Sequence, residues 1–506
     1  MTAIRPRSFM RAVAQTCIFL FCFLLPAIWA GAQVNPAVSA QLDASAVQGI
    51  VPALFLSDIH FEPFWDPAKA PQLAAAPVGE WKAILTAPPS VDREQRFQAL
   101  EKNCHVRGDD TSPALLDASL QAVRKQAAGA AFATVSGDLI AHAFSCKFDA
   151  VFPHAPAGAY RAFVEKTIAY VFQELGSSLP GVPLFVALGN NDSDCGDYRL
   201  DAHGAFLSDT AAEFTQGFPA TEQRSAQQTF VAGGYYSVSL PAPLHNARLL
   251  VLNDLFMSGK YATCAGRPDP RAADEQLAWL RQQLDEARRN GEKVWVMGHI
   301  PPGVDLHETM TKMRDVCGGE APQMFLGSEK MADELAGFGD VIQLAIFAHT
   351  HMDEMRILQP EDGVRGPGKS VALKIVPSIS PINGNAPAFT LAEVDAVSAG
   401  LKDYRVFVAS NRTGIDAVWK EEYDFGRRYH AAEFSAVSAR KLIAGFLTGM
   451  GANSEARSAY IQSFMPGSAS SLLGLVWPQY VCSLAHYSGA GYRSCACPSA
   501  ASLRKD

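Results

Sequence analysis

Six short apolar runs constrain the fold of this 506-residue chain more than any other feature of its sequence. They are Ala53–Leu56, Ala131–Val135, Pro183–Leu188, Arg248–Leu252, Lys293–Met297 and Leu344–Phe347. Each has the length of a buried strand and is too short for a buried helix. Stretches with helical spacing lie between them, at 114–127, 160–175 and 271–290. This alternation predicts a layered α/β fold with a largely buried sheet.

Five of these runs are followed at once by side chains that can bind a metal. The clusters are Ser57-Asp58-Ile59-His60, Gly137-Asp138, Gly189-Asn190-Asn191-Asp192, Gly298-His299 and His349-Thr350-His351. Ligands of open α/β sheets bind in the crevice outside the carboxyl ends of the strands. We therefore expect the five clusters to converge at one edge, although they lie far apart in the sequence.

The residue types in these clusters suit a pair of divalent cations. Two metal ions about 3.5–4 Å apart neutralise phosphoryl oxygens and lower the pKa of a bridging water. Two aspartates, four histidines and one asparagine favour zinc, with iron or manganese as alternatives, whereas calcium prefers an all-oxygen shell. The sequence thus predicts a metal-dependent hydrolase that forms a hydroxide nucleophile at moderate pH.

The N-terminus has the pattern of a secretory signal peptide over residues 1–32. Three arginines precede the uncharged apolar stretch Val13–Trp29, and small residues follow at Ala30–Ala32. Cleavage would give a secreted or periplasmic protein with a leader over residues 33–50; an uncleaved membrane anchor is the alternative. No later segment has the roughly 20 apolar residues that a membrane helix needs, so no integral membrane segment is expected after cleavage.

Charge and cysteine content agree with export and limit the partners. The net charge of −8 falls to −11 without the signal peptide, which carries three arginines and no acidic residue. A negative surface repels polyanions, so no stable nucleic-acid partner is expected. Eight cysteines remain, and an even number in an oxidising compartment predicts disulfides whose pairing the sequence does not determine.

The motif order resembles that of the calcineurin-like metallophosphoesterase superfamily, which runs D-x-H, G-D, G-N-[HD], G-H and H-x-H. Within it, the chain is most similar to the acid sphingomyelinase-like phosphodiesterases. The residues that carry this similarity are Gly298–Gly303, His349–Glu354, Pro377–Pro381, Asn385–Phe389 and Trp419–Tyr423. The resemblance spans roughly residues 50–430 and includes no saposin-like domain.

The resemblance implies a four-layered β-sandwich flanked by helices, with the motifs on loops at one edge. It also implies that Asp58, His60 and His351 hold one metal. Asn190, His299 and His349 would hold the other, with Asp138 bridging the two. We expect this catalytic domain over residues 51–400, followed by a small, mainly helical, cysteine-containing region over residues 401–506.

One position departs from the family pattern. Asn191 stands where the third motif usually has a histidine that protonates the leaving oxygen, and an amide cannot donate a proton at useful pH. Either the leaving group needs little protonation or another residue serves. His142, four residues after Asp138, is the candidate, and the alternative is that it orients Asp138 or the phosphate.

These features predict a secreted phosphodiesterase of the acid sphingomyelinase type that acts on a small phosphorylated substrate, such as a lipid or a nucleotide. The Gly-Asn-Asn-Asp form of the third motif also resembles that of endopolyphosphatases, so a phosphoanhydride substrate is an alternative. A further alternative is a metal-binding protein in which Asn191 leaves only weak turnover.

Overall fold

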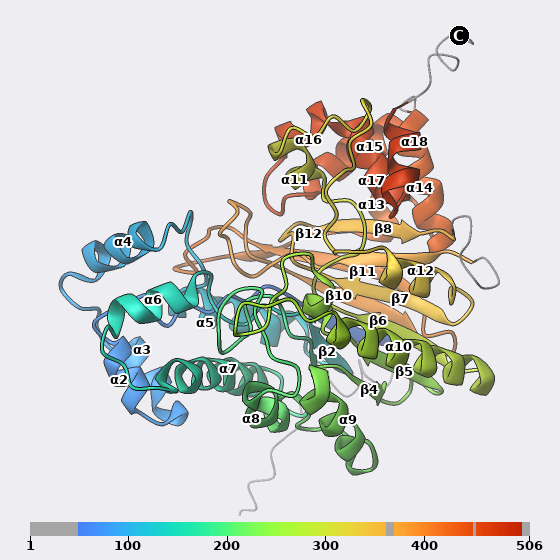
Figure 1. Cartoon of the computed structure of the whole chain (residues 1–506). Coiled ribbons are helices and arrows are strands. Elements are labelled where there is room, and N and C mark those ends of the chain that lie inside the picture. The colour runs from blue at the N-terminus through green and yellow to red at the C-terminus, as the bar shows by residue number, and fades with distance from the viewer. Residues whose placement is uncertain (1–48, 361–368, 449–451, 498–506) are drawn as a thin grey trace, which may run out of the picture.

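Two six-stranded sheets form the centre of the molecule (Figure 1). The computed structural model describes residues 49–360, 369–448 and 452–497. The predicted signal peptide (1–32) and nearly all of the leader lie outside these residues. The first sheet has the order β12 (Trp419–Asp424), β11 (Leu401–Ala409), β10 (Ala388–Asp395), β1 (Ile50–Leu56), β2 (Phe132–Val135) and β3 (Leu184–Val186). The second has β4 (Tyr236–Ser239), β5 (Ala247–Val251), β6 (Lys293–Met297), β7 (Ile342–Phe347), β9 (Val371–Ile375) and β8 (Glu354–Leu358).

The six apolar runs of the sequence form strands β1, β2, β3, β5, β6 and β7, as predicted. In the first sheet, β1, β2 and β3 are parallel, and β10, β11 and β12 extend it as an antiparallel meander. In the second sheet, β5, β6, β7 and β9 are parallel, and β4 and β8 pair antiparallel at its edges. The parallel strands of each sheet therefore end at a common edge.

Strand β6 shows how the sheets pack face to face. Side chains of successive strand residues point to opposite faces. Trp295 and Met297 lie in the core between the sheets, whereas Val294 and Val296 face a second core. The ring of Trp295 packs against Phe55 and Phe132 of the first sheet, with centroids 5.8 and 5.6 Å away. This contact joins the two sheets into a sandwich.

Helices cover the outer faces of the sandwich. In the second core, α10 (Pro270–Asn290) and α12 (Lys330–Ala336) pack on the second sheet. On the first sheet lie α5 (Pro113–Gln126) and α7 (Ala159–Ser178) (Figure 1). The remaining helices of the body are α2 (Ala70–Ala75), α3 (Trp81–Thr86), α4 (Arg93–Asn103), α6 (Phe144–Val151), α8 (Ala205–Phe214), α9 (Ala220–Gly233) and α11 (Leu306–Thr311), with short 3₁₀ turns η1 (Val78–Glu80) and η2 (Asp254–Met257). The predicted mixed α/β class and helix-flanked sheets are confirmed.

The long helices begin where local capping chemistry favours it. The hydroxyl of Ser112 accepts from the Leu115 amide at 3.2 Å, and Pro113 occupies the first turn of α5. The carboxylate of Asp269 accepts from the Arg271 amide at 3.1 Å, and Pro270 begins α10. A side-chain acceptor satisfies a free helical N–H, and proline fits the first turn because it lacks one.

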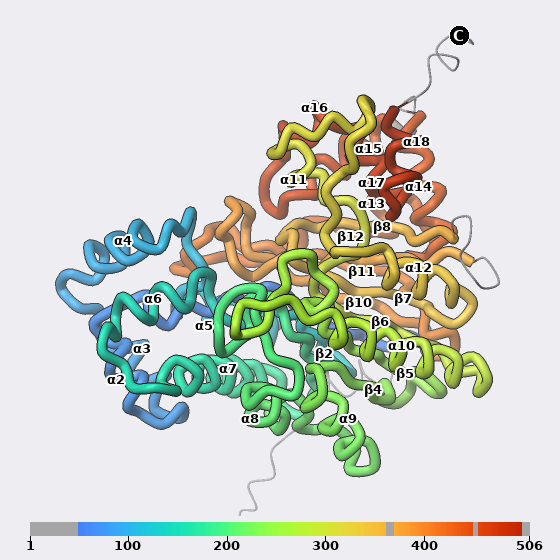
Figure 2. The backbone as a smooth tube through the Cα atoms, in the orientation of Figure 1, coloured from blue at the N-terminus to red at the C-terminus, as the bar shows by residue number. Residues whose placement is uncertain are grey.

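The predicted division at residue 400 requires a correction. Strands β11 and β12 lie beyond it and complete the first sheet, so the sheet continues to Asp424 and the helical region begins at Phe425. That region contains α13 (Phe425–Tyr429), α14 (Ala436–Thr448), α15 (Ala452–Ser463), α16 (Ser471–Leu475), α17 (Trp477–Ala485) and α18 (Gly489–Ala496). In the tube of Figure 2 these helices, in red, gather at one end of the sandwich beside the yellow segment around α11.

All eight cysteines after residue 32 form disulfides, as predicted. The pairs are Cys104–Cys146, Cys195–Cys264, Cys317–Cys497 and Cys482–Cys495. The third pair joins α18 to the loop after α11 and so fixes the C-terminal helices to the body. None of the helices in the described part of the chain is both long and apolar enough to cross a membrane.

The contact between the sheets gives a first prediction. Trp295→Ala removes the fully buried ring and leaves the Ala399 carbonyl without its donor, the Trp295 Nε1 at 2.7 Å. We expect the free energy of unfolding to fall by about 3–5 kcal/mol, measured by chemical denaturation followed with circular dichroism. Leu475→Ala is the control, since Leu475 is 81% exposed, and should change stability by less than about 0.5 kcal/mol. Equal losses in the two variants would contradict this role of Trp295.

Candidate metal centre

The loops that follow five parallel strands converge at one edge of the sandwich. Asp58 and His60 follow β1, Asp138 follows β2 and Asn190 follows β3. From the second sheet, His299 follows β6, and His349 and His351 follow β7. The seven residues predicted as metal ligands are thus brought together. Ligand atoms lie within 4.8 Å of one another in the groups Asp58/His60/Asp138 and Asp138/His299/His349, and His351 forms a further such group with His60 and His142.

The first group of ligand atoms surrounds Nε2 of His60. His60 Nδ1 donates to the Ile140 carbonyl at 2.9 Å, so a neutral ring presents a lone pair at Nε2. Around it lie His351 Nε2 at 3.2 Å, Asp138 Oδ2 at 3.4 Å and Asp58 Oδ1 at 3.9 Å. Asp58 Oδ1 is buried and has no hydrogen-bond partner among the described residues. These four atoms can each donate an electron pair, and few protons lie between them. The group therefore has the composition of a metal-binding site.

The second group surrounds Nε2 of His299. His299 Nδ1 donates to the Ser136 carbonyl at 2.7 Å, which directs Nε2 towards Asn190 Oδ1 at 3.1 Å and Asp138 Oδ2 at 3.2 Å. The amide orientation of Asn190 follows from its Nδ2, which donates to Asp197 at 2.7 Å. His349 Nδ1 completes the group at 3.3 Å from His299 Nε2. This arrangement also fits a cation.

One carboxylate oxygen belongs to both groups. Asp138 Oδ2 lies 3.4 Å from His60 Nε2 and 3.2 Å from His299 Nε2. Asn191 holds this carboxylate from a third direction: its backbone N donates to Oδ1 and its side-chain Nδ2 donates to Oδ2, both at 2.9 Å. The amide of Asn191 therefore orients the shared carboxylate.

Five of the seven residues have a left-handed backbone. The φ angles are 45° at Asp58, 43° at His60, 55° at Asp138, 71° at His349 and 65° at His351. A non-glycine residue in this region costs of order 1–3 kcal/mol and persists only where the surroundings enforce it. Here backbone hydrogen bonds link the loops, as from Asp58 N to the Gly137 carbonyl at 3.1 Å and from His60 N to the Asp138 carbonyl at 2.9 Å.

Two glycines allow the loops to approach so closely. A Cβ on Gly189 would overlap the carboxylate and the amide of Asp138. A Cβ on Gly137, where φ is 89°, would lie 2.8 Å from both the Gly189 amide and His299 Nδ1. The glycine that precedes Asp138 and the one that precedes Asn190 are thus required by close packing.

Burial and mutual charge shift the pKa values of the cluster in opposite directions. Burial lowers the pKa of His60 to about 4 and that of His349 to about 3, so both rings are neutral, the form that binds metals. Burial raises the pKa of Asp58 to about 7. For Asp138, burial opposes ionisation, but His299 and His60 outweigh it and hold the pKa of this carboxyl well below its usual value. For His299, burial opposes protonation, but Asp138 and Asp58 outweigh it and raise the pKa to about 10, so a metal ion bound at its Nε2 would displace a proton.

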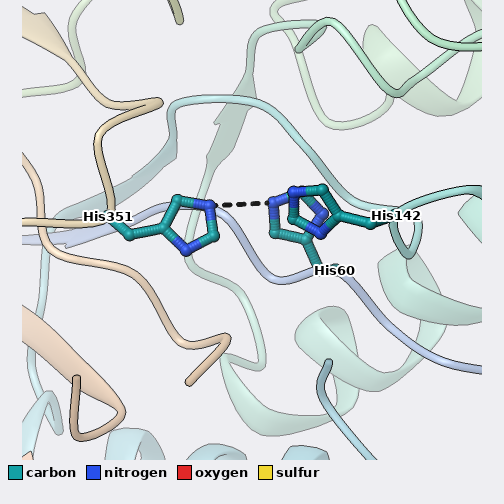
Figure 3. A group of neighbouring side chains, drawn as sticks. All are labelled: His60, His142 and His351. Carbon is teal, nitrogen blue, oxygen red and sulfur yellow. Dashed lines mark hydrogen bonds between the residues drawn. The ribbon is translucent and has the colours of Figure 1, made fainter. Parts of the chain in front are cut away.

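His142 lies beside the first group and closer to solvent. Figure 3 shows its ring stacked on that of His60, next to the His60–His351 contact. The centroids of the two stacked rings are 4.0 Å apart. Its side chain is 33% exposed, whereas that of His60 is fully buried. His142 Nδ1 donates to the buried carboxylate of Asp110 at 3.0 Å, and Asp110 also accepts from the His142 amide at 2.7 Å. Asp110, and not Asp138, therefore orients His142.

The family model described as calcineurin-like phosphoesterase matches residues 51–353, more than half of the chain. The chain belongs to the calcineurin-like phosphoesterase family. This confirms the resemblance seen in the order of the five motifs.

Relatives of this calcineurin-like phosphoesterase include named phosphodiesterases. Sphingomyelinase phosphodiesterase C of Dictyostelium discoideum is 26% identical over 268 residues, which cover 50% of this chain and 54% of that protein. Mouse acid sphingomyelinase-like phosphodiesterase 3b is 26% identical over 398 residues, 76% of each chain. The human cyclic GMP-AMP phosphodiesterase is 26% identical over 289 residues, 55% of this chain and 59% of that protein. The chain thus matches between about half and three quarters of the length of these relatives.

Three aspartates support the site in ways that the sequence did not predict. Asp254 follows strand β5 and accepts from the amides of His299 at 2.7 Å and Ile300 at 3.0 Å. Asp254 could have been predicted in the same way as the other clusters, because it also follows the end of a strand. Asp192 accepts from Gly189 N at 2.9 Å and Leu139 N at 2.8 Å and so joins the second and third motifs. Asp110 has no comparable pattern, because it precedes helix α5 and its partner lies 32 residues away.

The residues after His351 connect the site to the C-terminal helices. Asp353 is buried, pairs with Lys374 and accepts from the hydroxyl of Tyr423 at 2.6 Å. The buried carboxylate of Glu354 accepts from the hydroxyl of Tyr480 at 3.0 Å. Neither acid is solvated; each ties the loop that carries His351 to residues beyond 420.

The role of Asp254 gives a second prediction. Asp254→Asn removes the charge of the acceptor that holds the His299 loop and places an amide nitrogen in the position of one carboxylate oxygen, against the Ile300 N–H, so we expect metal affinity to fall about 10–100-fold. Competition titration with a metal-binding dye measures the affinity, and circular dichroism verifies that the fold persists. Asp274→Asn, at a carboxylate that is 61% exposed, is the matched control. Unchanged metal affinity in Asp254→Asn would show that the carboxylate does not position His299.

Proposed function

We propose that this chain is an exported, dinuclear-metal phosphodiesterase. The observation that carries the proposal is the oxygen shared by two ligand groups, Asp138 Oδ2, which lies within 3.4 Å of an imidazole Nε2 on each side. In the assignment that follows from the motifs, Asp58, His60 and His351 would hold one metal ion. Asn190, His299 and His349 would hold the second, and Asp138 would contribute to both.

A metal pair would supply charge neutralisation at the phosphoryl oxygens and a nucleophile at moderate pH, and the imidazole-rich donor set favours zinc over calcium, with iron or manganese as alternatives. The protein groups have separate tasks. Ile140 and Ser136 accept from Nδ1 of His60 and His299, which fixes the ring orientations. Asn191 holds Asp138 and leaves proton donation to another group.

We assign that proton donation to His142. Asp110 fixes Nδ1 of its ring, and the side chain is partly exposed beside the first ligand group. A histidine held in this way can donate a proton to a leaving oxygen from its other nitrogen. The assignment to His142 accounts for a site whose usual acid position is an amide.

The relatives support a phosphodiester substrate, because their names refer to sphingomyelin and to cyclic GMP-AMP. We place a small phosphodiester of the lipid or nucleotide class first. A phosphoanhydride is the second candidate, since its leaving group is weakly basic and depends less on an acid. Four disulfides support a secreted or periplasmic location, because such bonds persist in oxidising compartments.

The first test of this function is turnover. Metal-loaded protein should hydrolyse bis-p-nitrophenyl phosphate, and Asp138→Asn should lower kcat at least about 10²–10³-fold because the shared charge is lost. Metal content is quantified on the same samples. Failure of the wild-type protein with zinc, manganese and iron would favour a metal-binding protein over an enzyme.

The second test concerns His142. We expect His142→Ala to slow alkyl phosphodiesters, which have poor leaving groups, by about 10²-fold or more. The p-nitrophenyl esters need little protonation and should slow much less. The measurement is kcat/KM across a series of leaving groups. Equal slowing across the series would remove the general-acid assignment and leave His142 as a positioning residue.

A further inference from the structure

A lysine ammonium lies beside the second ligand group without a carboxylate partner. Lys260 Nζ lies 4.9 Å from the centroid of the Tyr198 ring. The hydroxyl of Tyr198 in turn lies 3.3 Å from His349 Nε2. One aromatic ring therefore separates the ammonium from a residue of the proposed metal centre. Among the residues that the structure describes, no acceptor forms a hydrogen bond or ion pair with this ammonium.

The loop that carries Lys260 is fixed to the loop of the third motif. The disulfide Cys195–Cys264 joins the two loops, with Cα atoms 5.4 Å apart. Ala262 N donates to the Tyr198 carbonyl at 3.0 Å, and Leu200 N donates to the Ala262 carbonyl at 3.2 Å. These links fix the backbone of the loop that carries Lys260 next to the loop that carries Asn190.

The carboxylates near this lysine have other partners. Asp197 accepts from Asn190 Nδ2 at 2.7 Å. Glu308 pairs with Lys312 at 3.0 Å. Lys260 is exposed, so its positive charge is available to a ligand at the site. The chain as a whole has a net charge of −8. A positive charge next to the phosphoryl site therefore favours binding of an anion at this place.

We propose that Lys260, supported on the Tyr198 ring, binds a second phosphate of the substrate while the phosphate that reacts lies at the metal centre. The ligand class is a diphosphate or triphosphate chain, as in a nucleotide or a short polyphosphate. This inference rests on the proposed function and refines its substrate class towards compounds with adjacent phosphates. A cation held over an aromatic face can still donate to a phosphate oxygen from its free side.

The test compares two inhibitors of bis-p-nitrophenyl phosphate hydrolysis by the metal-loaded protein: pyrophosphate and orthophosphate. Pyrophosphate has the second phosphate and orthophosphate lacks it. In Lys260→Gln we expect the inhibition constant of pyrophosphate to rise about tenfold relative to that of orthophosphate. This is the effect of losing one charge-assisted contact. Lys260→Arg keeps the charge and should restore most of the preference.

Lys330→Gln is the matched control, because Lys330 is an exposed lysine that pairs with Asp274 away from the site. It should leave the ratio at the wild-type value. An unchanged ratio in Lys260→Gln would overturn the proposal, as would an equal change in the control. If the wild-type protein has no turnover, the proposed function fails on its own, and equilibrium dialysis of the two anions decides on Lys260 by the same ratio.

Discussion

The carboxylate of Asp138 is the constraint on which the site depends. Its Oδ2 is within reach of imidazoles from both sheets, because His60 follows β1 and His299 follows β6. A carboxylate can be shared in this way only if the carboxyl ends of strands from both sheets lie at the same edge. The packing of Trp295 against Phe55 and Phe132 holds the sheets in that alignment. The core between the sheets and the chemistry at their edge are therefore parts of one arrangement.

This arrangement requires a strained backbone in the ligand loops, and several surrounding elements keep the backbone in that conformation. Asp58, Asp138 and His351 have left-handed φ angles that an isolated loop would not retain. The loop hydrogen bonds oppose their relaxation from one side. From the other side, Tyr423 and Tyr480 hold the residues that follow His351. The last strand of the first sheet and the C-terminal helices thus support the geometry of the site, although they contribute none of the seven residues.

The sequence predicted six of the twelve strands that the structure describes and the convergence of the seven residues because both depend on local patterns. A buried parallel strand is a continuous apolar run, and a polar cluster directly after it marks the edge. The boundary at residue 400 was wrong because neither strand beyond it is a continuous apolar run: β11 (Leu401–Ala409) has charged residues in its first half, and β12 (Trp419–Asp424) is mostly polar and only partly buried. Disulfide pairing and the Asp110–His142 contact could not be predicted, since they depend on how distant loops meet. Asp254 could have been found, because it follows β5 as the other clusters follow their strands.

Asn191 keeps the shared carboxylate oriented at a position where the family pattern usually has a histidine. An imidazole at this position would be free to donate to a leaving group, whereas the Asn191 amide donates to Asp138 Oδ2 at 2.9 Å. The substitution therefore exchanges a proton donor for a group that fixes the shared carboxylate. The ring of His142 stacks on that of His60 with centroids 4.0 Å apart, and His142 is held by a separate acid, Asp110. If His142 has the general-acid role proposed for it, orientation of the shared carboxylate and supply of a proton belong to residues of two different loops, Asn191 after β3 and His142 after β2.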